Sequence, residues 1–227
     1  MNTNATPRPR WRRYLRHHPS AFLLAAQLAS LLLYPLMDDT HSGRLLLGAV
    51  GLVVVPLAVW VVNHSPGQNW IAWLLAVPAV GLSLASIVLE RPGWNTASSM
   101  LEAALYFYAA GGLIRYMLHD HRVSADELYA AGATFTLLAW GFAYAFFVCQ
   151  AWYPGSFTGL VEPERPRSWM ELLFLSFTTL SGVGSGDILP LGSPARVLVM
   201  LQQFAGVGYI AAVVSRLIGL TIIRERR

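Results

Sequence analysis

The feature that most constrains this chain is a series of long, nearly uncharged apolar blocks. A helix needs about 20 mostly apolar residues to span the hydrocarbon core of a bilayer. Runs of this kind occupy residues 20–37, 44–62, 70–89, 98–118, 128–153 and 193–223. Charged residues make up only 12% of the chain, whereas soluble domains carry roughly 25%. The sequence therefore predicts an all-α integral membrane protein with six transmembrane helices.

A shorter apolar segment, residues 168–180, lies between the last two runs. It is too short to cross a bilayer, and it suits a re-entrant helix that enters and leaves on one side. Ser168 and Glu171 have the spacing of a capping box, in which each side chain accepts a hydrogen bond from the backbone of the other residue. The loop that follows, residues 181–187, reads Ser-Gly-Val-Gly-Ser-Gly-Asp.

The basic residues predict the orientation of the helices. All 16 are arginine, and they are concentrated at the two chain ends and in the loops. Arginine favours the cytoplasmic side of a membrane, so both termini and the linker at 119–127 are expected there, and the short helix on the outer side. A nucleic-acid partner would require a basic face, whereas here the basic residues lie at the chain ends and in the loops. The absence of lysine is typical of a GC-rich bacterial genome, so we expect a multi-pass protein of a bacterial inner membrane.

The glycine-rich loop is the part of the sequence that carries chemistry. Irregular backbone at membrane depth survives only where it is buried in protein or lines water. Glycines at 182, 184 and 186 allow alternate left- and right-handed conformations, which would turn successive carbonyl oxygens to one side. Four copies around an axis would then stack rings of oxygens that replace the hydration shell of a cation. The negative end of the short helix dipole would favour the same ion.

Other uses of a glycine-rich loop fit less well. A P-loop requires a lysine, and this chain has none. Ser185 has Val183 two residues before it, where a nucleophile elbow requires glycine. We therefore expect no enzyme, and a plain glycine-rich turn between two helices is the remaining structural alternative.

The residues of this segment resemble a known family. Phe177-Thr178-Thr179-Leu180, followed by Gly182-Val183-Gly184-Ser185-Gly186-Asp187-Ile188 and Pro190, resembles the pore signature of the potassium-channel superfamily. Residues 196–219 are similar to the inner helix of the bacterial two-helix-pore ion-channel family. The resemblance covers about residues 128–223, and over residues 1–120 it extends only to the six-helix layout.

The resemblance implies a homotetramer that conducts K⁺ and has membrane lipids and monovalent cations as its other partners. The implied selectivity filter is Ser181, Gly182, Val183, Gly184, Ser185, Gly186 and Asp187, with K⁺ at the carbonyls of Gly182, Val183, Gly184 and Ser185. No organic cofactor is expected. The implied parts are a cytoplasmic arm at 1–19, a four-helix voltage-sensor-like unit at 20–118, the linker at 119–127 and a pore unit at 128–223, with its pore helix at 168–180, filter at 181–187 and inner helix at 193–223.

Two departures from the family pattern Thr-Val-Gly-Tyr-Gly bear on selectivity. Gly182 replaces the threonine whose hydroxyl helps form the innermost ion site, and Ser185 replaces the tyrosine that braces the filter. The matching pore-helix positions, Phe174 and Leu175, supply no tryptophan donor. We expect a more compliant filter with weakened K⁺/Na⁺ selectivity. The alternatives are a non-selective monovalent cation channel, or a non-conducting membrane sensor or transporter subunit.

The inner helix contains a candidate hinge and a candidate gate. Gly206 lies where relatives place a hinge glycine, although small residues such as Gly206 and Gly208 also serve close helix packing. An apolar stripe at three- and four-residue steps would line the cavity and close it by dewetting, or would pack subunits together. Its members are Val207, Ile210, Val214, Ile218 and Ile222.

The first four helices carry too little charge for a voltage sensor. Sensors use 3–4 arginines per subunit, whereas the fourth helix has only Arg115 and one acid, Glu102. We expect no voltage gating. His119 and His121 could sense pH or bind a metal, or could belong to a solvated linker. Glu162 and Glu164 could concentrate cations at the outer mouth, or could pair with Arg165 and Arg167.

Overall fold

The computed structural model describes residues 19–33, 56–57, 69–89, 92–119, 125–184 and 186–225. Its elements are α2 (Pro19–Leu33), α4 (Asn69–Leu89), α5 (Pro92–His119), α6 (Ala125–Trp152), β1 (Phe157–Gly159), α7 (Trp169–Leu180), β2 (Ile188–Pro190) and α8 (Ser193–Glu225). The chain is mostly helical, as the sequence predicts. The basic arm at 1–18 and nearly all of the expected run at 44–62 lie outside the described residues.

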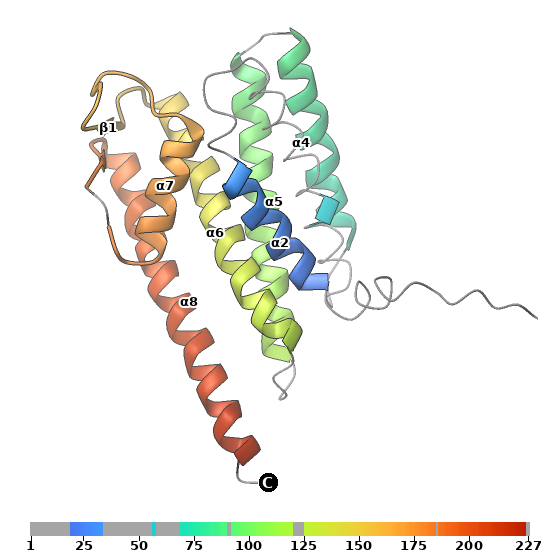
Figure 1. Cartoon of the computed structure of the whole chain (residues 1–227). Helices are drawn as coiled ribbons and strands as arrows, with labels where there is room; N and C mark the ends of the chain where they lie inside the picture. The colour runs from blue at the N-terminus through green and yellow to red at the C-terminus, as the bar shows by residue number, and fades with distance from the viewer. Residues whose placement is uncertain are drawn as a thin grey trace, which may run out of the picture.

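Helix α6 stands at the centre of the arrangement. Helices α2 and α5 pack against it, α4 packs on α5, and α7 and α8 lie on its other side (Figure 1). A single apolar core joins α2, α4, α5 and α6, with Leu105, Leu113 and Leu137 fully buried, and it reaches α7 at Leu173. Helices α2, α4 and α5 therefore share one core with α6 and α7.

Two helices of the described part are long and apolar enough to cross a membrane, over Asp126–Trp152 and Ser193–Val213. Shorter apolar helices cover Pro19–Leu33, Trp70–Ser83 and Trp169–Leu180. The fourth expected helix begins at Pro92 rather than at residue 98. Proline is favoured at the first position of a helix, because its missing N–H would have no partner there. The six-helix count stays a prediction.

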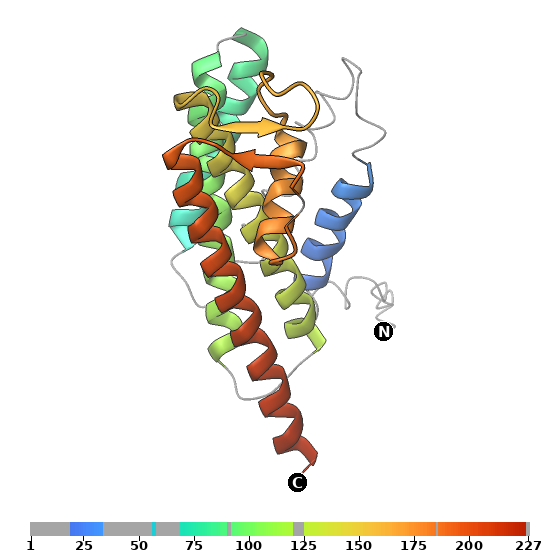
Figure 2. The same cartoon turned by 90° about the vertical axis from the view of Figure 1, so that its left-hand side faces the viewer.

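Helix α7 starts and ends where the sequence predicts. Its capping box is confirmed: Glu171 N donates to Ser168 Oγ at 3.2 Å, and Ser168 N donates to Glu171 Oε2 at 2.6 Å. After Leu180 the chain turns back and reaches β2, which pairs antiparallel with β1 near the end of the molecule where α7 begins (Figure 2). The segments before α7 and after its loop thus lie at the same end of the molecule.

The two short strands differ from the all-α prediction. The register pairs Phe157 with Pro190 and Gly159 with Ile188. Each strand has only 3 residues, too few to show the alternating pattern by which strands are found in a sequence. The two-stranded sheet joins the segment before α7 to the segment after the glycine loop. It therefore holds together the two ends of the hairpin that α7 and the loop at 181–187 form.

Candidate functional site

The backbone of the loop at 181–187 adopts the conformations for which its glycines are suited. The φ angles are 76° at Gly182, 67° at Gly184 and 75° at Gly186. Val183 has no positive φ, so the sign of φ alternates over 182–184. Ser185 lies outside the described residues. A Cβ on any of the three glycines would meet nothing within 4 Å, so this chain alone does not cover the loop.

The loop is attached to the end of α7 through its N–H groups. Ser181 N donates to Phe177 O at 3.0 Å, and Gly182 N donates to Thr179 O at 3.1 Å. Gly184 N donates to Thr178 O at 3.0 Å. In each bond the helix supplies the carbonyl and the loop supplies the donor. The carbonyl oxygens of the loop glycines therefore stay outside these bonds.

Gly182, which stands where the family pattern has threonine, has a positive φ. A β-branched residue rarely adopts this conformation, so the family threonine would require a different local backbone. Of the matching brace positions, Leu175 is buried and Phe174 is 46% exposed. Neither carries a side-chain donor.

The end of the molecule at which α7 begins is organised by Arg167, whose side chain is 1% exposed. Its guanidinium donates to the backbone carbonyls of Val161, Glu162 and Arg165. A Cβ on Gly159 would collide with Arg167 Nη1, so the glycine makes room for the guanidinium. Gln150 of α6 holds the Arg167 backbone by two reciprocal bonds of 2.8 and 3.0 Å. The buried guanidinium of Arg167 thus ties together three backbone carbonyls of the segment between β1 and α7.

The acids near this end pair with arginines. Glu162 Oε2 lies 2.9 Å from Arg165 Nε, and Arg165 and Arg167 both reach Glu171 Oε1, at 3.0 and 3.4 Å. Burial raises the pKa of Glu171, but hydrogen bonds from Ser168 and the two guanidinium groups outweigh it, so the pKa lies below its ordinary value. Of the two roles expected for Glu162, the structure therefore favours pairing with an arginine. Glu164 and Asp187 are exposed, and the Asp187 carbonyl accepts from Leu160 N at 3.1 Å.

Helix α8 lies against the end of α7 at Gly206. A Cβ on this residue would overlap the backbone carbonyl of Leu180, whereas a Cβ on Gly208 would meet nothing within 4 Å. This approach favours the packing alternative for Gly206. The hinge role stays a prediction.

The predicted cavity stripe is only partly described. Val207 is 65% and Ile210 is 40% exposed, so both lie on a face of α8 that this chain leaves uncovered. Val214, Ile218 and Ile222 fall within α8, but their side chains lie outside the described ones. Phe204, which sequence reasoning did not single out, extends this face and is 81% exposed.

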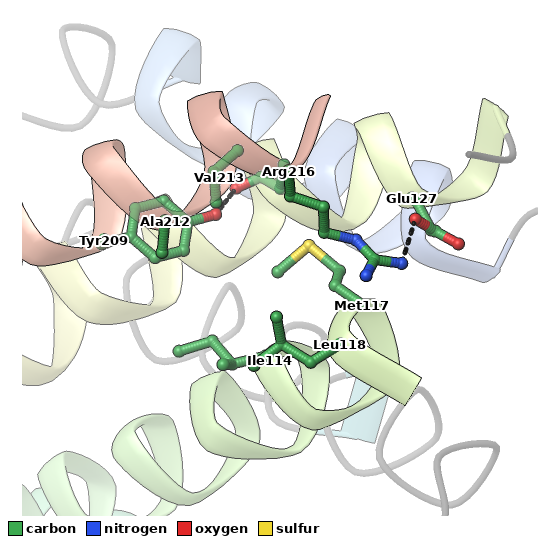
Figure 3. A pocket seen from close by; sticks show the side chains of 9 residues that line it. Ile114, Met117, Leu118, Glu127, Tyr209, Ala212, Val213 and Arg216 are labelled. Carbon is green, nitrogen blue, oxygen red and sulfur yellow. Dashed lines mark hydrogen bonds and ion pairs between the residues drawn. The ribbon is translucent and has the colours of Figure 1, made fainter. Parts of the chain in front are cut away.

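An ion pair joins the lower part of α8 to the start of α6. Arg216 Nη2 lies 3.1 Å from Glu127 Oε2, and the pair lies beside a small cavity between α5, α6 and α8 (Figure 3). Apolar side chains such as Ile114, Met117 and Val213 form most of the wall. Sequence reasoning missed this pair. Its signal was Arg216 within the apolar run at 193–223 and Glu127 directly before the run at 128–153, since charges at membrane depth usually have partners.

The remaining candidates lie on α5 and in the expected linker after it. Arg115 is exposed near the end of α5. Glu102 accepts a hydrogen bond from Ser98 Oγ at 3.3 Å, and it also bonds to Tyr144 of α6. His119 is exposed at the last position of α5, and His121 lies outside the described residues. Within the described part of the chain, no group of three His, Cys, Asp or Glu residues could hold a metal ion.

The short capped helix, the left-handed glycines behind it and the long apolar helices on either side are features of a membrane pore domain. A family model described as "Ion channel" matches residues 132–222, from within α6 to within α8. The match supports an ion-channel pore domain of the potassium-channel type in this segment, and residues 1–131 lie outside it. Neither the curated proteins nor the solved structures include a match to this chain.

Proposed function

We propose that this chain is one subunit of a homotetrameric channel that conducts K⁺ passively through a pore lined by carbonyl oxygens of residues 181–187. The observation that carries the proposal is the alternating backbone at Gly182 and Gly184, at the end of a capped helix and inside the segment that the ion-channel family model matches. Such a backbone can present successive carbonyls to a dehydrated cation.

The exposure of the loop supports assembly from several copies. Val183 is 80% exposed, and the three glycines have open space where a Cβ would stand. Irregular backbone of this kind cannot face lipid. A second chain on each side would cover it, and four chains would close rings of oxygen around one axis. One chain supplies a quarter of each ring, so a monomer would not conduct.

Weakened discrimination between K⁺ and Na⁺ follows from the same loop. Gly182 brings no hydroxyl to the innermost site, and neither Phe174 nor Leu175 can donate a hydrogen bond to brace the filter. Both accounts of selectivity, cavity fit and number of coordinating oxygens, depend on a filter that holds its shape. A more compliant loop should therefore pass Na⁺ more readily than the family pattern does.

Ion flux through purified protein in liposomes tests the proposal. We expect K⁺ flux and a smaller but measurable Na⁺ flux, with a reversal potential short of the ideal K⁺ value under opposed gradients. A reversal potential at the ideal value would contradict weakened selectivity. Equal permeation of both ions would favour the non-selective alternative, and no flux of either would favour a non-conducting sensor or transporter subunit.

A further inference from the structure

The inner helix α8 and the short helix α7 touch at two levels that keep the same spacing. Gln202 contacts Ser176, and Gly206 abuts Leu180, so a step of four residues on one helix matches a step of four on the other. Four residues make about one helical turn. The two helices therefore run side by side in the same direction with a defined register (Figure 2).

The upper contact is a chain of hydrogen bonds through three helices. Gln202 Nε2 donates to Ser176 O at 2.9 Å and to Ser176 Oγ at 2.6 Å. Ser176 Oγ in turn donates to Ala139 O of α6 at 2.6 Å. All three residues are fully buried. The middle of α7 is thus tied to the helix on each side of it.

Packing alone does not explain a buried glutamine at position 202, because burying polar atoms costs free energy unless each has a hydrogen-bond partner. Its Oε1 is buried and finds no partner among the described residues, a cost that an apolar side chain of similar size would avoid. Polar groups at membrane depth commonly mark function. The adjacent Gln203 is exposed and shares none of these contacts.

The lower contact fixes the end of α7 from which the glycine loop starts. Because Gly206 has no Cβ, α8 lies directly against the Leu180 carbonyl, one residue before Ser181. Any side chain at 206 must push Leu180 away, and the loop amides bonded to Thr178 and Thr179 would move with it.

We infer that Gln202 and Gly206 are positioning residues that clamp α7 against α8 and thereby set the geometry of the loop at 181–187. The inference rests on the proposed function of that loop. The clamp acts through backbone position, since neither residue belongs to the loop itself. It predicts that selectivity depends on two residues of the inner helix that never touch the ion.

The test compares matched pairs of full-length variants in liposomes, with K⁺ and Na⁺ flux measured side by side. Gln202→Leu should change the K⁺/Na⁺ flux ratio by about threefold, the effect of one interhelical hydrogen bond. Gln203→Leu, the same change one residue on, should leave the ratio unaltered. Gly206→Ala should lower the ratio and the melting temperature of the protein, whereas Gly208→Ala should change neither.

Ser176→Ala is a second, milder variant that keeps the test valid if Gln202→Leu fails to fold. It removes one acceptor of Gln202 and keeps the backbone carbonyl, so it should shift the ratio in the same direction by a smaller amount. Equal ratios in Gln202→Leu, Ser176→Ala and Gln203→Leu would overturn the clamp while leaving the channel proposal intact. Wild-type protein that passes neither ion would overturn both.

Discussion

Arg216 of α8 pairs with Glu127 of α6 across 89 residues of sequence, with 3.1 Å between Nη2 and Oε2. The Glu127 side chain is 7% exposed and that of Arg216 is 17% exposed. The pair therefore joins the C-terminal half of α8 to the first turn of α6, beside the end of α5 (Figure 3).

Removing one partner of this pair should destabilise the protein. Glu127→Gln removes the carboxylate that lies 3.1 Å from the Arg216 guanidinium, which costs about 3 kcal/mol for a buried pair. Arg216→Gln should have a similar effect. The double variant Glu127→Gln/Arg216→Gln should cost less than the sum of the two, because no lone charge is left. Chemical unfolding in detergent measures all three, and additive effects would contradict the pairing.

Replacing the buried Arg167 by lysine should lower the stability of the protein. A single ammonium cannot reach the three carbonyls that the guanidinium serves, so Arg167→Lys should lose about 2 kcal/mol of unfolding free energy. Arg165→Lys is the matched control, since that side chain is 47% exposed, and it should change stability by less than about 0.5 kcal/mol. Thermal unfolding of both variants decides the point, and equal losses would refute this role for Arg167.

The lowered pKa of Glu171 predicts a pH dependence of stability. A carboxyl whose pKa is lower in the folded state contributes stability above its ordinary value of 4.5 and loses it as the pH falls through the folded pKa. The melting temperature should therefore fall as the pH drops below 4.5. Glu171→Gln should have a lower melting temperature at neutral pH and a weaker dependence in the acid range. Glu164→Gln, at an exposed acid, should follow the wild-type profile; if Glu171→Gln also follows it, the assignment is wrong.

The left-handed backbone at Gly184 should make alanine unfavourable there. With φ at 67°, the substitution imposes a strain of about 1–2 kcal/mol unless the loop rearranges. Either response disturbs the carbonyl array, so Gly184→Ala should abolish or strongly reduce K⁺ flux. Gly111→Ala places the same methyl group in open space on α5 without a positive φ, and it should leave flux unchanged. Full flux through Gly184→Ala would contradict a filter built on this backbone.

The four-helix unit should confer no voltage dependence. Arg115 is exposed near the end of α5 and is the only basic residue of the expected fourth helix, apart from the terminal His119. One charge moved through 100 mV supplies only about 2.3 kcal/mol. Currents through reconstituted protein should show the same weak voltage dependence in wild type and in Arg115→Gln. Steep voltage dependence that Arg115→Gln abolishes would refute this prediction.

Local sequence signals were sufficient for the hairpin of the pore unit. The Ser168–Glu171 spacing predicts a helix start that the structure confirms, because a capping box acts within one turn. Alternating glycines predict left-handed conformations, and the structure has them at Gly182, Gly184 and Gly186, because φ is a property of single residues. Two strands of 3 residues carry no such signal and were missed.

The sequence by itself determined the helical class, the extent of α7 and the backbone of the glycine loop, since each depends on composition or on neighbours within one turn. Only the tertiary structure decided that Gln202 bonds to Ser176, that Gly206 lies on Leu180 and that Arg216 meets Glu127. These contacts depend on the rotation and depth of one helix against another. That register is set by the packing of whole helix faces, which no short sequence pattern encodes.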